Sequence, residues 1–238
     1  MELLDYQSYD FDSLKQSKVD NCLFFKVEGS RIVVLVIIYV DDILIATSRS
    51  EDMRFIQTKL KMSFKMKDMG DLNFFLRMEV TYNQKEGFLQ LSQVGYAEKI
   101  LERFNMTKAK PVATPLALGV NLDAEDTDLD HQFPYREAVG SLMYLMLGTG
   151  PDLCFSIGML SRYLDKPREV HVVAVKRVLL YLRGTTQLRI RFDFGKPFSP
   201  QIYADSNWAN DLKDRKSTCG YICIAGEQSA ISWRSMKQ

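Results

Sequence analysis

Two adjacent carboxylates, Asp41 and Asp42, stand in a strongly apolar stretch of this 238-residue chain. The stretch 32–46 reads Ile-Val-Val-Leu-Val-Ile-Ile-Tyr-Val-Asp-Asp-Ile-Leu-Ile-Ala. β-Branched runs of this kind are typical of strands, so the pair is predicted to lie at the turn of a buried hairpin. Carboxylate oxygens are hard ligands of the kind that Mg²⁺ and Mn²⁺ prefer. Both residues are therefore candidate metal ligands.

A carboxylate pair on a rigid hairpin suits phosphoryl transfer with two divalent ions, which lie roughly 3.5–4 Å apart in such sites. The alternative is structural. Asp is common in hairpin turns because its side chain bonds local backbone groups and tolerates left-handed conformations. For an isolated Asp-Asp pair the structural interpretation is favoured, so the rest of the chain has to decide between the two.

Composition excludes several classes of protein. With 46% hydrophobic and 26% charged residues, the chain is globular rather than disordered or fibrous. Its 31 Lys and Arg residues balance 30 Asp and Glu residues, so any nucleic-acid surface must be local. The four cysteines show neither zinc-site nor disulfide-framework spacing. No secretory signal is recognisable, and no apolar run approaches the roughly 20 residues of a membrane-spanning helix.

The first third of the chain contains the elements expected to position the carboxylates. The continuously apolar arm 32–40 predicts a strand that is covered on both faces. Ser48 and Glu51 have the spacing of a helix capping box. A second hairpin is expected over 73–91, followed by a helix with Ser92 as its N-cap.

The remaining chain predicts helices first and strands afterwards. Helices are expected at 135–147, 153–164 and 168–183, and strands at 188–194, 201–205, 217–225 and 230–234. Prolines and the acidic stretch 123–130 predict a long connector before the first of these helices. The order indicates an α+β fold.

The box Tyr39-Val40-Asp41-Asp42 resembles the catalytic hairpin of copia-type (pseudoviral) retrotransposon reverse transcriptases. Further blocks resemble the same family, follow its order and cover almost the whole chain. These blocks are 64–72, 91–93 with Tyr96 and 100–101, 113–116, 135–145, 176–179, 181–185, 203–209, 214–221 and 231–233.

This resemblance implies RNA- or DNA-templated DNA synthesis coupled to ribonuclease H cleavage of the RNA strand. It implies Mg²⁺ or Mn²⁺ as cofactor, a template–primer and deoxynucleoside triphosphates as partners, the remainder of a Pol polyprotein, and a cytoplasmic location. It divides the chain into the C-terminal half of a palm (1–86), a primer-grip strand, connector and helical thumb (87–186), and the N-terminal strands of an incomplete ribonuclease H-like domain (187–238).

The resemblance also assigns site residues. Asp41 and Asp42 are the expected polymerase carboxylates and metal ligands, and Asp205 matches the first ribonuclease H carboxylate. Four cations on the predicted thumb helices are candidate contacts to nucleic-acid phosphates, although a solvated helix face explains each of them equally well. They are Arg136, Lys176, Arg177 and Arg183.

Two features of the family pattern have no match. In the family a further polymerase Asp comes from an earlier palm strand, and the upstream candidates Asp5, Asp10, Asp12 and Asp20 do not resemble that motif. The later ribonuclease H carboxylates also lack a counterpart. We therefore expect a chain truncated at both ends relative to the family and inactive on its own. A non-catalytic template–primer-binding module and an inert remnant of a decayed element remain the alternatives.

Three residues depart from the family pattern, and one of them is Asn207, which stands in place of an Asp. Arg77 stands where a glycine is usual in the primer-holding hairpin, and Gly150 stands where an arginine is usual before Pro151. An arginine in place of that glycine would obstruct a close approach of the backbone to the primer.

Overall fold

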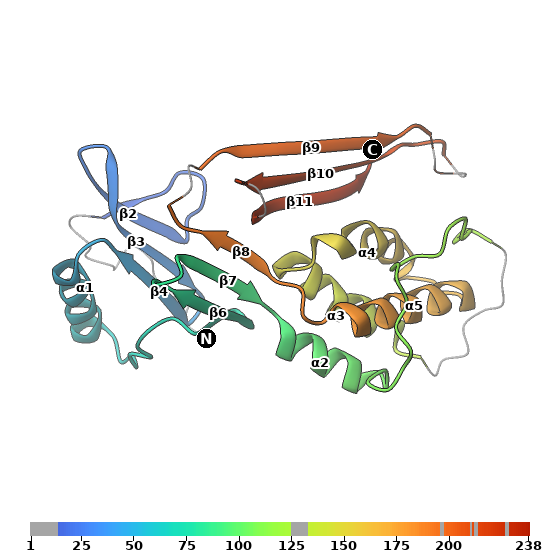
Figure 1. Cartoon of the computed structure of the whole chain (residues 1–238), viewed down its shortest axis with the longest axis horizontal. Helices are drawn as coiled ribbons and strands as arrows, with labels where there is room; N and C mark the ends of the chain where they lie inside the picture. The colour runs from blue at the N-terminus through green and yellow to red at the C-terminus, as the bar shows by residue number, and fades with distance from the viewer. Residues whose placement is uncertain (1–13, 125–132, 196–197, 210, 212–213, 227–228) are drawn as a thin grey trace. The chain divides into compact units, whose positions relative to one another are not determined.

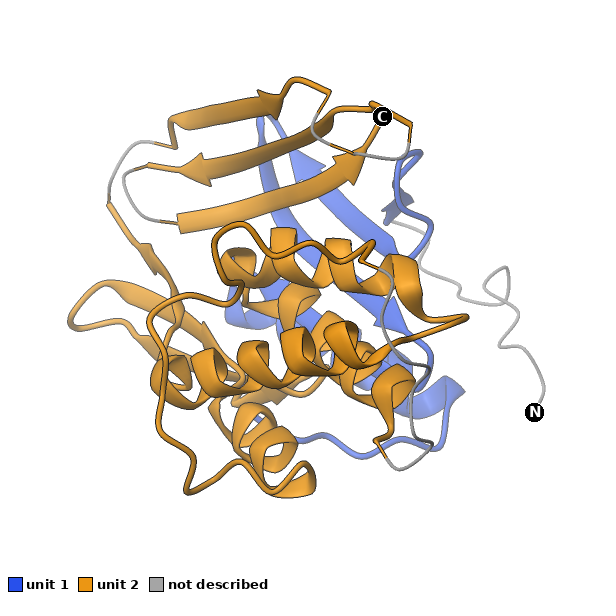
Figure 2. Cartoon of the chain, turned by 90° about the vertical axis from the view of Figure 1, so that its right-hand side faces the viewer, with its two compact units in different colours: residues 1–72 blue, residues 73–238 orange. Residues whose placement is uncertain are grey.

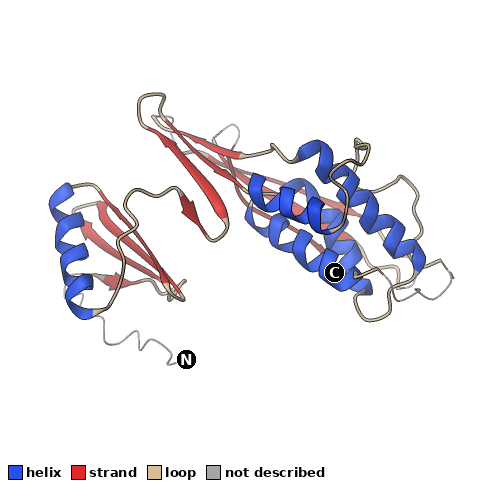
Figure 3. Ribbon diagram, turned by 90° about the horizontal axis from the view of Figure 1, so that it is seen from below, coloured by secondary structure: helices blue, strands red, loops and turns tan. Residues whose placement is uncertain are grey.

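The structure is a computed structural model that describes residues 14–124, 133–195, 198–209, 211, 214–226 and 229–238. It divides into two compact units, residues 1–72 and 73–238 (Figure 2). Each unit has helices and antiparallel sheets of its own, so the predicted α+β class is confirmed (Figures 1 and 3). Three of the upstream carboxylates and most of the predicted acidic stretch lie outside the described residues.

The first unit is an antiparallel sheet in the order β1-β2-β3-β4, followed by helix α1. Its elements are β1 (Lys15–Gln16), β2 (Leu23–Glu28), β3 (Arg31–Tyr39), β4 (Asp42–Thr47) and α1 (Ser50–Ser63). Val34, Val36 and Ile38 alternate along β3 and are buried together with Ile56 and Leu60 of α1. This packing forms the core of the unit.

The prediction that the strand 32–40 is covered on both faces is wrong. Leu35 and Ile37 alternate with the buried residues and remain partly exposed, so this part of the strand is packed on one face rather than two. The continuous apolar run was misleading because α1 covers only every second residue. An apolar sequence does not by itself show which face of a strand a helix will cover.

Both predicted serine caps are also wrong. Arg49 precedes α1, and the Ser48 hydroxyl donates to the carbonyl of Val33 at 3.4 Å instead of capping the helix. The Arg49 guanidinium donates to Asp52 in the first turn at 2.7 Å and holds the pKa of that carboxyl below its usual range. Ser92 is the last residue of a strand, where its hydroxyl donates to Glu79 at 2.9 Å.

The second unit begins with a four-stranded sheet in the order β5-β6-β7-β8. Its strands are β5 (Phe74–Phe75), β6 (Met78–Asn83), β7 (Phe88–Ser92) and β8 (Ile190–Asp193). β8 pairs with β7 from Phe88↔Asp193 to Leu91↔Ile190, although the two strands are far apart in sequence. One sheet thus combines strands from both sides of the expected divisions at 86/87 and 186/187, and these divisions remain predictions.

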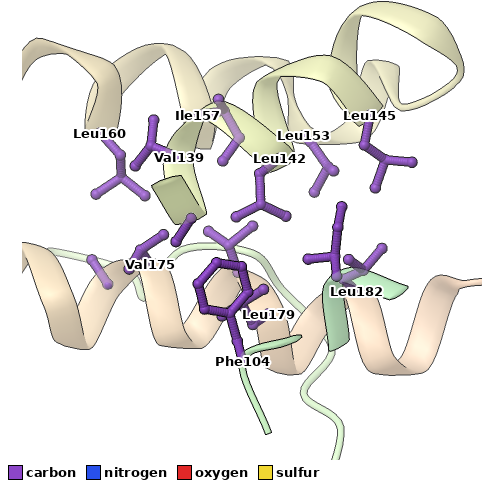
Figure 4. Packing of buried hydrophobic residues seen from close by; sticks show 14 of the residues in the cluster. Phe104, Val139, Leu142, Leu145, Leu153, Ile157, Leu160, Val175, Leu179 and Leu182 are labelled. Carbon is purple, nitrogen blue, oxygen red and sulfur yellow. The ribbon is translucent and has the colours of Figure 1, made fainter. Parts of the chain in front are cut away.

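The helical part of the second unit forms the largest core. Its elements are α2 (Val94–Arg103), α3 (Tyr135–Gly148), η2 (Pro151–Leu153), α4 (Cys154–Leu160), η3 (Ser161–Tyr163) and α5 (Glu169–Thr185). Leu142, Ile157 and Leu179 are fully buried, and side chains of α3, α4 and α5 point into one interior (Figure 4). The helix predicted over 153–164 is a short α-helix flanked by 3₁₀ turns, which are frequent at helix ends.

The last three strands form a separate sheet in the order β11-β10-β9. They are β9 (Pro200–Asn207), β10 (Thr218–Ala225) and β11 (Ser229–Lys237). β11 contacts the helices, since the Trp233 indole Nε1 donates to the carbonyl of Met146 at 3.0 Å. The buried carboxylate of Asp211 also accepts hydrogen bonds from Arg162 of η3 and Lys237 of β11. These contacts join the terminal sheet to the helical core.

A histidine-centred cluster fixes part of the connector. The Arg168 backbone N–H donates to His171 Nδ1 at 2.7 Å, so Nε2 carries the proton and donates to the carbonyl of Leu122 at 2.8 Å. Tyr163 stacks on the imidazole with ring centroids 4.0 Å apart and donates to Asp123. Burial, followed by the bond to Asp123, raises the pKa of Tyr163 to about 12.

Candidate active site

The carboxylate pair lies at a tight hairpin turn between β3 and β4. Tyr39 and Asp42 face each other as the last pair of the ladder, and Val40 and Asp41 form the turn. Val40 has a φ of 53°, a left-handed conformation that a β-branched residue seldom adopts. Two-residue hairpin turns require such conformations because they match the twist of the strands. The strand pairing therefore fixes where both carboxylates lie.

Both carboxylates are exposed, and the sheet determines which face Asp42 occupies. Ile38 and Ile43 form the preceding cross-strand pair and belong to the core beneath α1. Since side chains alternate along a strand, Asp42 and Tyr39 lie on the opposite, uncovered face. Asp41 is at the tip. The hairpin therefore presents two hard oxygen donors away from its own core.

The donor set around this pair is partial. Among the described residues, no three His, Cys, Asp or Glu side chains lie together as a metal-binding group. Asp20 lies near the same end of the sheet. The Ile38 backbone N–H donates to the carbonyl of Cys22, which is two residues after Asp20. Its carboxylate, however, accepts the Cys22 backbone N–H at 2.9 Å. Two carboxylates suit a divalent cation chemically but leave most of its coordination positions to other groups.

Asp205 belongs to the other unit. It lies on β9, pairs with Gly220 and is exposed. It lines a groove of about 630 Å³ between the terminal sheet and the start of α4, together with Phe155 and Trp233. The predicted ribonuclease H residue is therefore at an open groove rather than in the core.

The four candidate thumb cations all have partners within the chain. Arg136 donates to the carbonyl of Leu164, Arg177 to Thr114 and Arg183 to the carbonyl of Thr107. The Lys176 ammonium lies 5.2 Å from the ring centroid of Phe133. These contacts hold the connector and loops against the helices. Hydrogen bonds over such sequence distances leave no signal in the sequence.

The backbone conformation explains why a glycine is usual at position 77, where this chain has Arg77. Leu76 and Arg77 form the two-residue turn between β5 and β6, with φ values of 48° and 57°. Turns with two positive φ values favour Asn-Gly, because glycine has no Cβ to clash there. A glycine at position 77 would therefore relieve strain. In this chain the Arg77 guanidinium lies 6.0 Å from the ring centroid of Tyr96.

Comparisons with known proteins identify the family. Residues 7–118 match the family model described as reverse transcriptase (RNA-dependent DNA polymerase). The chain belongs to the family of copia-type Pol polyproteins, and the reverse-transcriptase match covers its first half. No solved structure matches it, and no helix of the described residues is long and apolar enough to cross a membrane.

Its relatives include much longer proteins. The chain is 38% identical over 241 residues to the retrovirus-related Pol polyprotein from transposon TNT 1-94 of Nicotiana tabacum, covering 96% of this chain and 18% of that protein. It is also 38% identical over 223 residues to the Pol polyprotein from transposon RE2 of Arabidopsis thaliana, covering 93% and 15%. An uncharacterized mitochondrial protein of Arabidopsis thaliana is 32% identical over 202 residues, covering 85% and 82%. The chain thus spans less than a fifth of these Pol polyproteins.

Proposed function

We propose that this chain is part of an RNA-directed DNA polymerase, and that Asp41 and Asp42 form one side of its two-metal site. The observation that carries the proposal is the geometry of the β3–β4 hairpin. It places both carboxylates at an exposed turn, with Asp42 on the face away from α1. Membership of the reverse-transcriptase family supports this chemistry over the purely structural interpretation of an Asp-Asp turn.

Mg²⁺ or Mn²⁺ is the proposed cofactor, held by the side-chain oxygens of Asp41 and Asp42. When bound in such a site, the ions activate the attacking oxygen and stabilise the leaving oxygen of an in-line displacement. The contribution of this chain is to position two anionic ligands on a hairpin whose strands are fixed by the core of the first unit. Since the described residues supply no third ligand nearby, we propose that the isolated chain does not extend primers.

The family resemblance also supports roles for the other parts. Residues 1–86 would be the C-terminal half of a palm, 87–186 a primer-grip strand, connector and thumb, and 187–238 the first strands of a ribonuclease H-like domain. Asp205 would be the remaining carboxylate of the second site. Two carboxylates, Asp152 and Asp205, line the open groove, and no third His, Cys, Asp or Glu of the described residues joins them as a metal-binding group. We therefore propose that the chain alone does not cut RNA–DNA hybrids. A cytoplasmic location is proposed on the same resemblance.

The second candidate function is template–primer binding without turnover. It is favoured by the partial set of carboxylates together with the intact helical core of the second unit. Arg136, Lys176, Arg177 and Arg183 are the proposed phosphate contacts. Each has a partner within the chain, but Arg136 and Arg183 remain exposed and can also reach a phosphate. Deoxynucleoside triphosphates and the rest of the polyprotein are further partners of the complete enzyme.

We expect the isolated chain to bind a primed RNA template weakly, with an affinity that falls as salt rises and without primer extension in Mg²⁺ or Mn²⁺. Each phosphate contact should add roughly 0.7 to 0.9 to the slope of log affinity against log salt. Fluorescence anisotropy at several salt concentrations measures that slope. Arg183→Gln should reduce it by about one contact, because the charge of an exposed cation is lost.

Lys59→Gln is the matched control, since this lysine is exposed on α1 of the first unit and is not a proposed contact. Its salt slope should equal that of the unmodified chain. Extension that disappears in Asp41→Asn would show that the isolated chain is a polymerase. Binding with no dependence on salt would refute the assignment of phosphate contacts.

A further inference from the structure

Thr114 is an exposed hydroxyl residue in the connector between α2 and α3, and Pro115 follows it directly. The residue before a proline is restricted to extended backbone conformations, because the proline ring clashes with a helical one. Residues 111–116 accordingly contain neither helix nor strand. The connector therefore presents a Thr-Pro dipeptide in an accessible, extended segment.

An arginine of α5 already bonds the Thr114 hydroxyl. Arg177 Nη2 donates to Thr114 Oγ1 at 2.9 Å. The Nε–H of the same guanidinium is buried and has no hydrogen-bond partner among the described residues. Nη2 and Nε lie on one edge of the planar guanidinium, which can bind two oxygens of a phosphate or carboxylate in parallel. The single threonine oxygen uses only one of these two donors.

A phosphate on Thr114 has the chemistry that this edge of Arg177 lacks. A phosphothreonine carries about −1.5 to −2 charge at pH 7 and three strong acceptor oxygens. Two of these oxygens can accept from Nη2 and Nε together. Because a buried donor without a partner is destabilising, the phosphate would form an ion pair and satisfy the unpaired Nε–H at the same place.

We propose that Thr114 is a phosphorylation site for a proline-directed protein kinase, and that Arg177 binds the phosphate which the kinase adds. In this reaction the Thr114 hydroxyl oxygen attacks the γ-phosphorus of ATP. The bond from that phosphorus to the bridging oxygen of ADP breaks, and the hydroxyl proton passes to the aspartate base of the kinase. ATP is thus the phosphate donor, and ADP is the second product.

Phosphorylation also changes the surface proposed to bind the template–primer, and this part of the inference rests on the proposed function. Arg177 is one of the four candidate phosphate contacts. In the modified chain its charge is neutralised by the phosphate on Thr114, and the added negative charge repels a nucleic-acid backbone. The modified connector therefore weakens template binding without any change in the helical core.

Incubation of the full 238-residue chain with ATP, Mg²⁺ and a purified cyclin-dependent kinase tests the modification. We expect mass spectrometry to find phosphate on Thr114 of the folded chain. Thr114→Ser should remain a substrate at this position, whereas Thr114→Ala should lose the phosphate. Ser199, before Pro200, is also exposed and is the reference site within the same chain. Phosphate on Ser199 but not on Thr114 overturns the proposal, as does a chain that the kinase leaves unmodified.

Phosphorus NMR of the phosphorylated Ser199→Ala chain tests the role of Arg177. The second ionisation of the phosphate should occur at a lower pH in the folded chain than in urea, because a guanidinium favours the dianion. Arg177→Gln should abolish this difference. Arg183→Gln is the matched control, since Arg183 lies on the same helix but bonds to the carbonyl of Thr107, and it should leave the difference unchanged. A titration that is insensitive to Arg177→Gln contradicts the pairing.

The salt dependence of template binding tests the consequence for function, and it requires no substitution at Arg177. In fluorescence anisotropy with a primed RNA template, phosphorylation of Thr114 should lower the salt slope by roughly 0.7 to 0.9 or more, the value of one lost phosphate contact. Equal slopes for the two forms would overturn the regulatory role. A template that neither form binds would overturn the proposed binding function instead, whereas mass spectrometry and phosphorus NMR decide the modification and its pairing with Arg177.

Discussion

Leu142→Ala should lower the free energy of unfolding of the second unit by about 3 to 5 kcal/mol. Leu142 lies on α3 in the middle of the helical core, with no exposed surface. Truncation removes buried apolar atoms and leaves a cavity, and both effects destabilise a packed core by this amount. Leu147 lies near the end of the same helix but is 67% exposed, so Leu147→Ala should change stability by less than about 0.5 kcal/mol.

Denaturant unfolding followed by tryptophan fluorescence provides this measurement. The two tryptophans of the chain, Trp208 and Trp233, are both in the second unit, so the signal reports that unit alone. Trp233 is the better reporter because its indole is bonded to the carbonyl of Met146 on α3. Equal midpoints for the Leu142→Ala and Leu147→Ala variants would show that the core is not packed around Leu142.

Asp211→Ala should destabilise the second unit by about 3 kcal/mol, because it removes the carboxylate that joins the terminal sheet to the helices. The Asp211 side chain is 3% exposed and accepts from both Arg162 and Lys237, each about a quarter exposed. Breaking an ion pair with one buried partner is costly, since the other charges lose their compensation. Hydrogen exchange at the β11 amides should rise together with the loss of global stability.

Asp214 supplies the control for the ion pairs of Asp211. Its carboxylate also bonds Lys237, at 2.9 Å, but is 43% exposed. An exposed ion pair contributes at most about 1 kcal/mol and is screened by salt. Asp214→Ala should therefore have a small effect that vanishes at high salt, whereas the effect of Asp211→Ala should persist. Similar losses of stability in the two variants would contradict the buried ion pairs of Asp211.

The sequence predicts local features of this fold better than distant ones. The hairpin around Asp41 follows from two β-branched runs and a turn, all within a few residues, and the structure confirms it. The pairing of β8 with β7 depends on the whole helical region folding between them, so no local pattern indicates it. The prediction of two serine caps was wrong because each hydroxyl bonds elsewhere. Ser48 donates to the carbonyl of Val33, and Ser92 donates to Glu79.

The candidate site could likewise be predicted only as far as its local features. Residue types identify Asp41 and Asp42 as possible ligands, but the uncovered face on which Asp42 lies depends on where α1 packs. The cations were selected by their charge and by their position on the predicted thumb helices, and their contacts within the chain became visible only in the structure. Positive φ at Leu76 and Arg77 was likewise hidden, because neither residue is typical of a left-handed turn.

Binding of Mn²⁺ to the isolated chain tests the central claim, that the hairpin of Asp41 and Asp42 is a divalent-metal site. Paramagnetic broadening of backbone amide signals reports weak binding and requires no catalytic activity. Substoichiometric Mn²⁺ should broaden the signals of 39–43 before those of another Asp-rich turn, 68–71, where Asp68 is paired with Lys61. Asp41→Asn and Asp42→Asn should each abolish this preference. Equal broadening at both turns, or broadening of 39–43 that survives both substitutions, would contradict the account.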